Sequence, residues 1–126
     1  MGRPAMTDFW RCDKLVAVED AVKRGAIIAV VVPCYHVQEH IEAVARSIPS
    51  YIHYIVLVDD GSQDSTPQVL KRLANEHIRV IHHTQNLGVG GAVLSGYQEA
   101  LRLGADIAVK MDGDGQMDAT YLPELI

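Results

Sequence analysis

The chain has 126 residues, of which 48% are hydrophobic and 21% charged, so it has room for one globular core. Its formal net charge is −5 and it contains no basic run, which excludes the electrostatic surface typical of nucleic-acid binding. The longest apolar run, Ala26–Val32, is too short to span a bilayer, and residues 1–11 lack the continuous apolar core of a secretory signal.

Residues 1–25 read as an N-terminal extension that contains one amphipathic helix. Within Asp13–Arg24, apolar residues recur at three- and four-residue spacing, and Gly25 follows as a stop signal. We expect this helix to pack on the outside of the domain. Cys12 and Cys34 are widely spaced, which argues against a disulfide framework or a structural zinc site and favours a cytoplasmic location.

From Gly25 onward, apolar runs alternate with amphipathic segments. Their centres recur at intervals of roughly 25 to 30 residues, the size of a βα unit, and continuous apolarity indicates strands covered on both faces. We predict strands at Ala26–Val32, Tyr54–Val58, Ile78–Ile81 and Ile107–Met111, and helices at Glu39–Ser47, Pro67–Glu76 and Gly90–Leu103. Residues 26–126 are therefore predicted to form a doubly wound α/β fold, a mainly parallel sheet with helices on both faces.

A chemically distinctive loop follows each predicted strand. In a doubly wound sheet, ligands bind outside the carboxyl ends of the strands, where these loops would meet. The four loops are Pro33-Cys34-Tyr35, Asp59-Asp60-Gly61-Ser62, Asn86–Gly91 and Asp112-Gly113-Asp114.

The loop after the second strand has a structural part and an unexplained part. Ser65 or Thr66 suits the N-cap of the next helix, and Pro67 suits its first turn. Capping does not require Asp59 and Asp60, two adjacent carboxylates that repel each other at the end of a buried strand. A carboxylate there can accept a hydrogen bond from a nucleobase N–H or a ribose hydroxyl.

The glycine-rich segment Asn86–Ala92 opens the third predicted helix, where exposed N–H groups can bind an anion. It is not a Walker loop, because no Gly-Lys-Ser/Thr follows, and it departs from the dinucleotide fingerprint at Val93. Its glycines equally suit a tight turn and close packing of the helix on the sheet through Ala92 and Gly96. Both interpretations remain open.

The segment Asp112–Gln116 places two carboxylates, separated by one glycine, at the end of the fourth strand. Hard oxygen ligands on a short loop suit Mg²⁺ or Mn²⁺, which leave coordination positions for substrate phosphates. An ordinary Asp-Gly turn is the alternative. An EF-hand is excluded, because Met117 stands where its loop needs Gly and Pro123 where it needs Glu.

The histidines favour no zinc site. His36 and His40 are four residues apart, but Val37 stands where a zincin has its Glu, and His82 and His83 would point to opposite sides of a strand. We expect solvated or hydrogen-bonded histidines.

Four motifs in order resemble family 2 glycosyltransferases with the GT-A fold, a Rossmann-like nucleotide-binding architecture. The Asp-x-Asp-x-Gln ending looks most like the branch that contains dolichyl-phosphate mannose synthase and bacterial polyprenyl-phosphate glycosyltransferases. The resemblance covers Ile27–Ile126 and rests on Val31–Tyr35, Val58–Thr66, Asn86–Gly96 and Asp112–Gln116. It implies a nucleotide-diphosphate-sugar donor, a divalent metal and a polyprenyl phosphate acceptor at the inner face of the membrane.

The resemblance also implies roles for individual residues. Pro33 and Tyr35 look like the wall on which the nucleobase rests, and Asp60, with Asp59 beside it, looks like the residue that bonds the base. The residues that resemble the metal motif are Asp112, Asp114 and Gln116, and of these Asp112 and Gln116 also look like donor ligands. His36 stands where the family often has Asn, and Ser65 where Gly is common.

The family's acceptor half has no counterpart in this chain, and Tyr121–Ile126 reads as the beginning of a helix. We therefore expect the N-terminal portion of a longer enzyme that transfers a sugar with inversion. The alternative is a nucleotide-sugar-binding module, or an inactive relative, without transfer activity. Because the sheet edge beside Asp112–Asp114 would lack a neighbouring strand, we expect the isolated chain to self-associate there or to be only partly ordered past Asp114, and to transfer no sugar.

Overall fold

The structure is a computed structural model that describes residue 20, residues 22–111 and the backbone of residues 117–121. The predicted helix Asp13–Arg24 lies mostly outside these residues, but its described end is helical. The amide of Gly25 donates to the carbonyl of Val22 (2.9 Å), and Gly25 has a φ of 91°, which ends the helix as predicted.

Five strands form one sheet in the order β3-β2-β1-β4-β5. The first four are parallel to one another: β1 (Ile28–Cys34), β2 (Tyr54–Asp59), β3 (Ile78–His82) and β4 (Ile107–Met111). Their bounds agree with the predicted strands to within two residues, and β4 agrees exactly. The prediction of a mainly parallel, doubly wound sheet is confirmed.

The fifth strand corrects the sequence analysis. β5 (Met117–Tyr121) pairs antiparallel with β4, with Met111 opposite Met117 and Ile107 opposite Tyr121. The interpretation of Tyr121 as the first residue of a helix was wrong, and so was the expectation that the edge of β4 is unpaired. An antiparallel partner needs only a short connection, and the sequence between Met111 and Met117 is short. Self-association of the chain stays a prediction.

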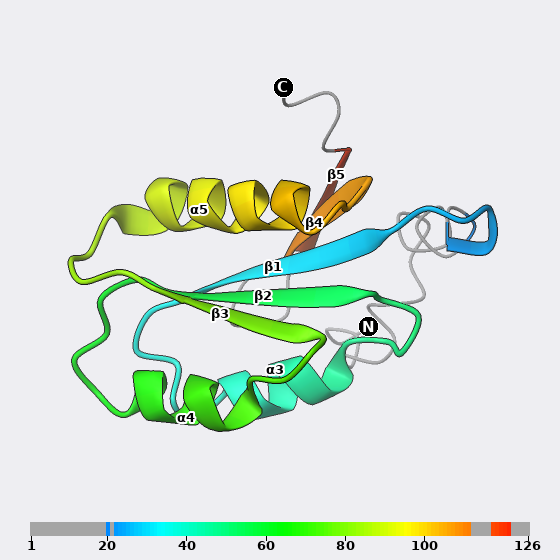
Figure 1. The fold of residues 1–126 in the computed structure, drawn as a ribbon. Helices are drawn as coiled ribbons and strands as arrows, with labels where there is room; N and C mark the ends of the chain where they lie inside the picture. Colours follow the sequence, from blue (N-terminus) through cyan, green and yellow to red (C-terminus); the bar gives the residue numbers. More distant parts are fainter. Residues whose placement is uncertain (1–19, 21, 112–116, 122–126) are drawn as a thin grey trace, which may run out of the picture.

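Helices cover both faces of the sheet, as predicted. α3 (Ile41–Ser47) and α4 (Thr66–Leu73) lie on one face and α5 (Gly88–Arg102) on the other (Figure 1). α4 ends three residues before the predicted Glu76, because the side chain of Asn75 accepts hydrogen bonds from the amides of His77 and Ile78 (2.8 and 2.9 Å) and closes a turn there.

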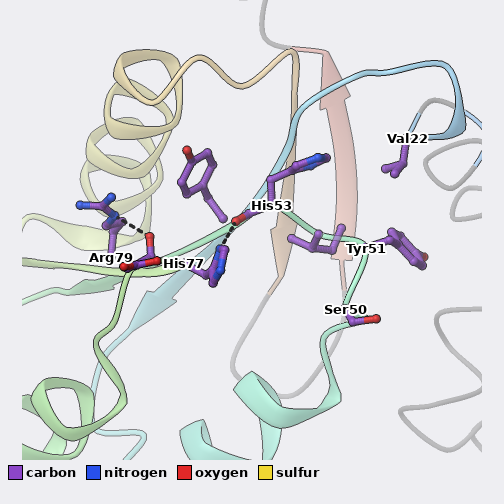
Figure 2. A pocket seen from close by; sticks show the side chains of 9 residues that line it. Val22, Ser50, Tyr51, His53, His77 and Arg79 are labelled. Atoms are coloured by element: carbon purple, nitrogen blue, oxygen red, sulfur yellow. Dashed lines mark hydrogen bonds between the residues drawn. The ribbon is translucent and has the colours of Figure 1, made fainter.

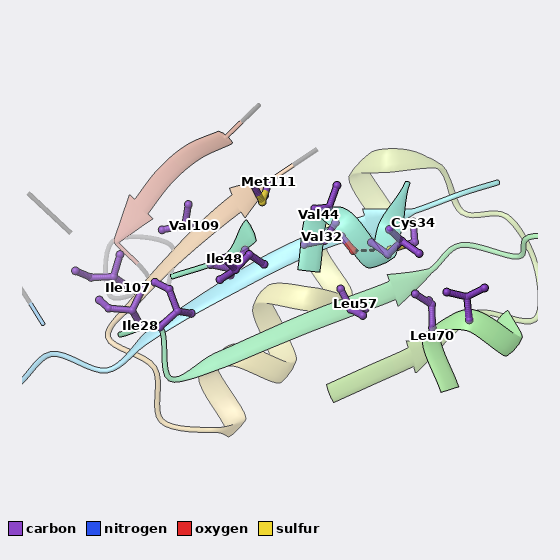
Figure 3. Close-up of a cluster of buried hydrophobic side chains, with 14 residues drawn as sticks. Ile28, Val32, Cys34, Val44, Ile48, Leu57, Leu70, Ile107, Val109 and Met111 are labelled. Carbon is purple, nitrogen blue, oxygen red and sulfur yellow. Dashed lines mark hydrogen bonds between the residues drawn. The ribbon is translucent and has the colours of Figure 1, made fainter. Parts of the chain in front are cut away.

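The core consists of two layers, one on each face of the sheet. The layer under α3 and α4 contains large side chains, including Ile28, Leu57 and Leu70, and Figure 3 shows it from close by. The layer under α5 contains small ones, including Ala29, Ala92 and Ala100. Every residue of β1 except Pro33 is buried between the two layers, so β1 is the central strand of the core.

Candidate functional site

The strand order places a topological switch point between β1 and β4. The chain passes from β1 to β2 and β3 on one side and then returns to β4 on the other side of β1. In folds of this kind, the carboxyl edge of the sheet at the switch point is the usual position of ligands.

A hollow of about 230 Å³ lies at this edge. Its lining comes from the end of β1, the end of β2 and the start of α5, and comprises Pro33, Cys34, Tyr35, Val37, Asp60, Val89 and Ala92. Three predicted donor-binding residues, Pro33, Tyr35 and Asp60, are thus brought together although they come from two loops. The volume is below that of pockets that enclose a drug-sized ligand, so it suits one ring system.

Tyr35 offers an aromatic surface at the mouth of the hollow. Its side chain is 48% exposed, and its ring stacks on that of His36, with centroids 4.1 Å apart and planes 15° from parallel. His36 has a φ of 52°, a left-handed conformation in which Asn and His are enriched. His36 therefore suits this backbone conformation, as an Asn would.

His36 also ties the β1 loop to the loop after β2. Its amide donates to Oγ of Ser62 (3.0 Å), and its Nε2 accepts from the amide of Gln63 (3.2 Å). Tyr35 stacks on His36, and His36 is hydrogen-bonded to the loop after β2. The position of the Tyr35 ring therefore depends on that loop.

Asp60 is buried in the wall of the hollow, with 2% of its surface exposed. Its Oδ1 accepts from the amide of Leu87 (2.8 Å) and lies 2.9 Å from Nδ1 of His83. Burial alone would raise the pKa of this carboxyl, but the hydrogen bonds from His83 and from the amides of Leu87 and Gly88 outweigh it and hold the pKa below its usual value. Asp60 is therefore an anion that can accept further hydrogen bonds from a ligand.

Asp59 is buried beside it but does not line the hollow. Its Oδ1 accepts from the amide of Ser62 (3.1 Å), and its Oδ2 lies 2.5 Å from Nδ1 of His82. No hydrogen bond of good geometry reaches this buried Oδ2 from the described residues. The two adjacent carboxylates are thus separated by function: Asp59 shapes the turn, and Asp60 faces the hollow.

A glycine allows the loops after β2 and β3 to meet. Gly61 has a φ of 77°, and a Cβ added there would lie 2.8 Å from the backbone nitrogen of Asn86. A larger residue would separate the segment before α5 from Asp60. The Asp60–Leu87 hydrogen bond therefore depends on Gly61.

The sequence analysis did not identify Leu87, His83 and Ser95 as contributors to the site. The expectation that the histidines are hydrogen-bonded is confirmed, since His83 also lies 2.9 Å from Oγ of Ser95. The sequence feature that could have predicted these contacts is the presence of two doublets, Asp59-Asp60 and His82-His83, each at the end of a strand. Asp59 and His82 are paired in the β2–β3 register, which places the two doublets side by side.

The N-cap prediction is confirmed in position only. Ser65 is the N-cap of α4, yet its side chain makes no capping hydrogen bond. The carboxylate of Asp64 accepts from the amide of Thr66 instead (2.9 Å), and Oγ1 of Thr66 accepts from the amide of Val37 (3.0 Å). This turn is therefore structural.

The predicted metal ligands Asp112, Asp114 and Gln116 lie outside the described residues. They fall between the end of β4 at Met111 and the start of β5 at Met117. Two carboxylates and an amide oxygen are hard ligands that fit Mg²⁺ or Mn²⁺. Within the part of the chain that the structure describes, no group of three or more His, Cys, Asp or Glu side chains could hold a metal ion.

Cys34 is not a nucleophile, although it lines the hollow. Burial and the neighbouring charge of Asp59 raise the pKa of its thiol to about 12, so the thiolate is absent at neutral pH. The hollow therefore offers an anion, an aromatic ring and apolar walls, which suit binding rather than covalent catalysis.

A larger hollow, of about 670 Å³, lies at the opposite edge of the sheet (Figure 2). Among its lining residues, His53 accepts a hydrogen bond from the amide of Ile28 through Nδ1 (3.1 Å), and the carbonyl of His53 accepts from Nδ1 of His77 (3.2 Å). These contacts connect strands to one another. None of the predicted site residues lines this hollow, so the carboxyl edge remains the better candidate despite its smaller volume.

Residues 29–126 match the model of the family described as Glycosyl transferase family 2. The chain belongs to this family. Among curated members, it is 36% identical over 105 residues to UDP-N-acetylglucosamine--dolichyl-phosphate N-acetylglucosaminyltransferase of Methanococcus voltae, covering 71% of this chain and 42% of that protein. It is 32% identical over 103 residues to polyprenol monophosphomannose synthase of Mycolicibacterium smegmatis, covering 77% of this chain and 38% of that protein. The chain thus spans about two fifths of the length of these family 2 relatives.

Solved structures share the fold of this chain. Glucosyl-3-phosphoglycerate synthase from Mycobacterium tuberculosis, in complex with Mn²⁺ and UDP-glucose, superposes with a TM-score of 0.55 at 22% identity, covering 90% of this chain and 39% of that one. Mannosyl-3-phosphoglycerate synthase from Rubrobacter xylanophilus gives a TM-score of 0.61 at 17% identity, covering 90% and 42%. Both support the fold alone. In the described part of the chain, no helix has the length and apolarity needed to cross a membrane.

Proposed function

We propose that this chain forms the donor-binding part of a glycosyltransferase that transfers a sugar, with inversion, from a nucleoside diphosphate sugar to a polyprenyl phosphate. The observation that carries the proposal is the hollow at the carboxyl edge of the sheet, in which Pro33, Tyr35 and Asp60 meet beside the start of α5. The names of the family 2 relatives, which include dolichyl-phosphate and polyprenol transferases, support the lipid-phosphate acceptor.

In this proposal the nucleobase occupies the hollow. Tyr35 provides an exposed ring against which a planar base can stack, and Pro33 and Val89 provide apolar walls. The buried carboxylate of Asp60 accepts a hydrogen bond from a base N–H. A carboxylate requires a donor on the base, which both uracil and guanine present, so UDP and GDP are the ligands to compare.

The diphosphate would extend from the base toward Asp112, Asp114 and Gln116, which follow β4 in the sequence. These residues would hold Mg²⁺ or Mn²⁺, and the M. tuberculosis complexes that contain Mn²⁺ together with UDP or UDP-glucose support a divalent ion. Such an ion stabilises the negative charge that develops on the departing diphosphate. A phosphate acceptor is already anionic at neutral pH, so this reaction needs no general base. The acceptor would place the protein at a membrane surface.

Isothermal titration calorimetry with UDP and GDP, with and without Mn²⁺, tests the proposal. We expect one of the two nucleotides to bind more tightly when Mn²⁺ is present. The Asp60→Asn substitution should weaken this binding about tenfold or more, because a hydrogen bond to a charged group contributes about 1.5–3 kcal/mol. Asp114→Asn should remove the Mn²⁺ dependence and leave metal-free binding unchanged.

Asp106→Asn is the matched control. The carboxylate of Asp106 also accepts from a backbone amide, that of Ile27 (2.8 Å), but at the opposite edge of the sheet. Its loss should leave nucleotide binding as in the wild type. Absence of binding for both nucleotides, or equal effects of the Asp60 and Asp106 substitutions, would contradict the proposal. Transfer of radiolabelled sugar to polyprenyl phosphate by a protein that includes the acceptor half separates an enzyme from a binding module.

A further inference from the structure

A chain of hydrogen bonds joins the carboxylate of Asp60 to α5 through a histidine. His83 is the first residue after β3, and its Nδ1 lies 2.9 Å from Oδ1 of Asp60 while its Nε2 lies 2.9 Å from Oγ of Ser95. The His83 side chain is only 11% exposed. These hydrogen bonds thus link the ends of β2 and β3 to the second turn of α5.

The chemistry of Asp60 and Ser95 decides which atom donates in each hydrogen bond of His83. A carboxylate can only accept, so Nδ1 of His83 must carry the hydrogen. In the neutral ring Nε2 is then bare, and the hydroxyl of Ser95 donates to it. The backbone amide of His83 donates to the carbonyl of Asp59 (2.8 Å), which fixes the residue at both its main chain and its side chain.

Two of the groups that donate to Asp60 converge on one of its oxygens. His83 and the amide of Leu87 both donate to Oδ1, so that oxygen is anchored from two elements. Oδ2 takes part in neither bond. Because two bonds to one oxygen restrict rotation of the carboxylate, its remaining oxygen keeps a constant direction in the wall of the hollow.

We propose that His83, with Ser95 behind it, is a positioning residue that holds the carboxylate of Asp60 in the orientation in which it accepts a hydrogen bond from the nucleobase. The inference rests on the proposed role of Asp60 in donor binding. His83 does not line the hollow, so it acts through Asp60 and not by touching the nucleotide.

The neighbouring residue shows why His83 is the one selected. Nδ1 of His82 also lies close to a carboxylate, that of Asp59, but the side chain of His82 is 54% exposed and Asp59 does not line the hollow. Of these two Asp–His pairs, only Asp60–His83 is connected to α5 by a further hydrogen bond, that to Ser95. The Asp60–His83 pair can therefore affect ligand binding, whereas Asp59 contributes to the turn.

The test compares two amide substitutions of His83 by calorimetry with UDP and GDP. The amide nitrogen of Asn occupies the position of Nδ1, so His83→Asn keeps the donor to Asp60. The amide nitrogen of Gln occupies the position of Nε2, so His83→Gln keeps only the contact to Ser95. We expect His83→Gln to weaken nucleotide binding about tenfold and His83→Asn to stay within about threefold of the wild type. Ser95→Ala should weaken binding about threefold.

A spectroscopic readout and two controls accompany the titrations. In ¹⁵N–¹H correlation spectra the ring of His83 should be protonated at Nδ1, a tautomer that a merely space-filling histidine does not require. Gln98→Ala, an exposed position on α5, and His77→Asn, at the opposite edge, should bind like the wild type.

Each outcome decides between the two proposals. Equal binding by both His83 variants and the wild type, equal weakening by both, or a ring protonated only at Nε2 would overturn the positioning role. If Asp60→Asn also binds like the wild type, the proposed contact between Asp60 and the base fails as well. If Asp60→Asn weakens binding and neither His83 variant does, the donor site stands without the positioning residue.

Discussion

The two faces of the sheet are packed in different ways. Alternate residues of β1 point to opposite faces: Ile28, Val30 and Val32 join the layer under α3 and α4, while Ala29 and Val31 join the layer under α5. The first layer consists of large aliphatic side chains. The second is rich in alanine and includes a glycine, Gly96, whose added Cβ would lie 2.2 Å from Cγ1 of Val31.

The two faces therefore make different contributions: one mainly stabilises the fold, and the other mainly positions the site. Large side chains under α3 and α4 remove the most apolar surface from water, which makes that face the main source of stabilisation. Small side chains under α5 let the helix approach the sheet closely. That approach brings the amide of Leu87, just before α5, within 2.8 Å of Asp60.

The largest effect should come from the face with the large side chains. Leu57 is fully buried there, and its neighbour in β2, Val56, is fully buried on the opposite face. Leu57→Ala should lower the free energy of unfolding by about 3–5 kcal/mol, because it removes transfer free energy and leaves a cavity. Val56→Ala removes less apolar surface and should cost about half as much. Urea denaturation measures both, and equal losses would contradict the comparison.

The next effect should come from overpacking the small-residue face. Gly96→Ala places a methyl group against Val31, which is fully buried and β-branched, so the helix must move away from the sheet. We expect a loss of about 1–3 kcal/mol in the free energy of unfolding. Nucleotide binding should weaken as well, because the same movement lengthens the Leu87–Asp60 hydrogen bond.

Gly90→Ala is the control for helix propensity. Gly90 lies in the same helix, and a Cβ added there meets nothing within 4 Å. This substitution should stabilise the chain by about 0.5–1 kcal/mol. A second substitution, Val31→Ala, should recover part of the loss in Gly96→Ala, since the two residues are in contact. Additive losses in the double variant would show that Val31 is not the obstacle.

The sequence predicted the parallel part of the fold well, because each strand is a continuous apolar run between turn residues. β4 was predicted to the residue, and α5 began two residues before the predicted Gly90. β5 was missed because strands were predicted only at continuous apolar runs, whereas Met117–Tyr121 alternates apolar and polar residues, the pattern of a strand with one covered face.

The residues of the candidate site could be named from the sequence, but the contacts between them could not. Pro33 and Tyr35 could be named because their motif resembles that of family 2 glycosyltransferases, and Asp60 also because a carboxylate at a strand end suits a nucleobase or a ribose. The partners of Asp60 could not, because they depend on the register of β2 against β3, which places His82 opposite Asp59. Register is a property of the assembled sheet and leaves little trace in a strand whose two faces are both buried.

The smallest expected change in the free energy of unfolding comes from one hydrogen bond on each face of the sheet, and only one of these bonds should depend on pH. At the carboxyl edge, Thr66 accepts from the amide of Val37 beside α4, and Asp60 accepts from the amide of Leu87 beside α5. One acceptor is neutral and the other is an anion. Thr66→Val and Asp60→Asn should each lower the free energy of unfolding at pH 7 by about 1–2 kcal/mol.

Only the second loss should depend on pH. Folding lowers the pKa of Asp60 below its ordinary value of 3.8, since its hydrogen bonds outweigh burial, so its charge stabilises the folded state above that value. This contribution is lost as the pH falls from about 4 through the lower pKa of the folded state, where the carboxyl becomes protonated as it does in the unfolded chain. Urea denaturation at pH 7, 5, 4 and 3 should therefore show the deficit of Asp60→Asn shrinking in the most acidic samples, while that of Thr66→Val stays constant. A deficit of Asp60→Asn that grows on acidification would mean that burial prevails and that Asp60 is protonated more readily when folded than when unfolded.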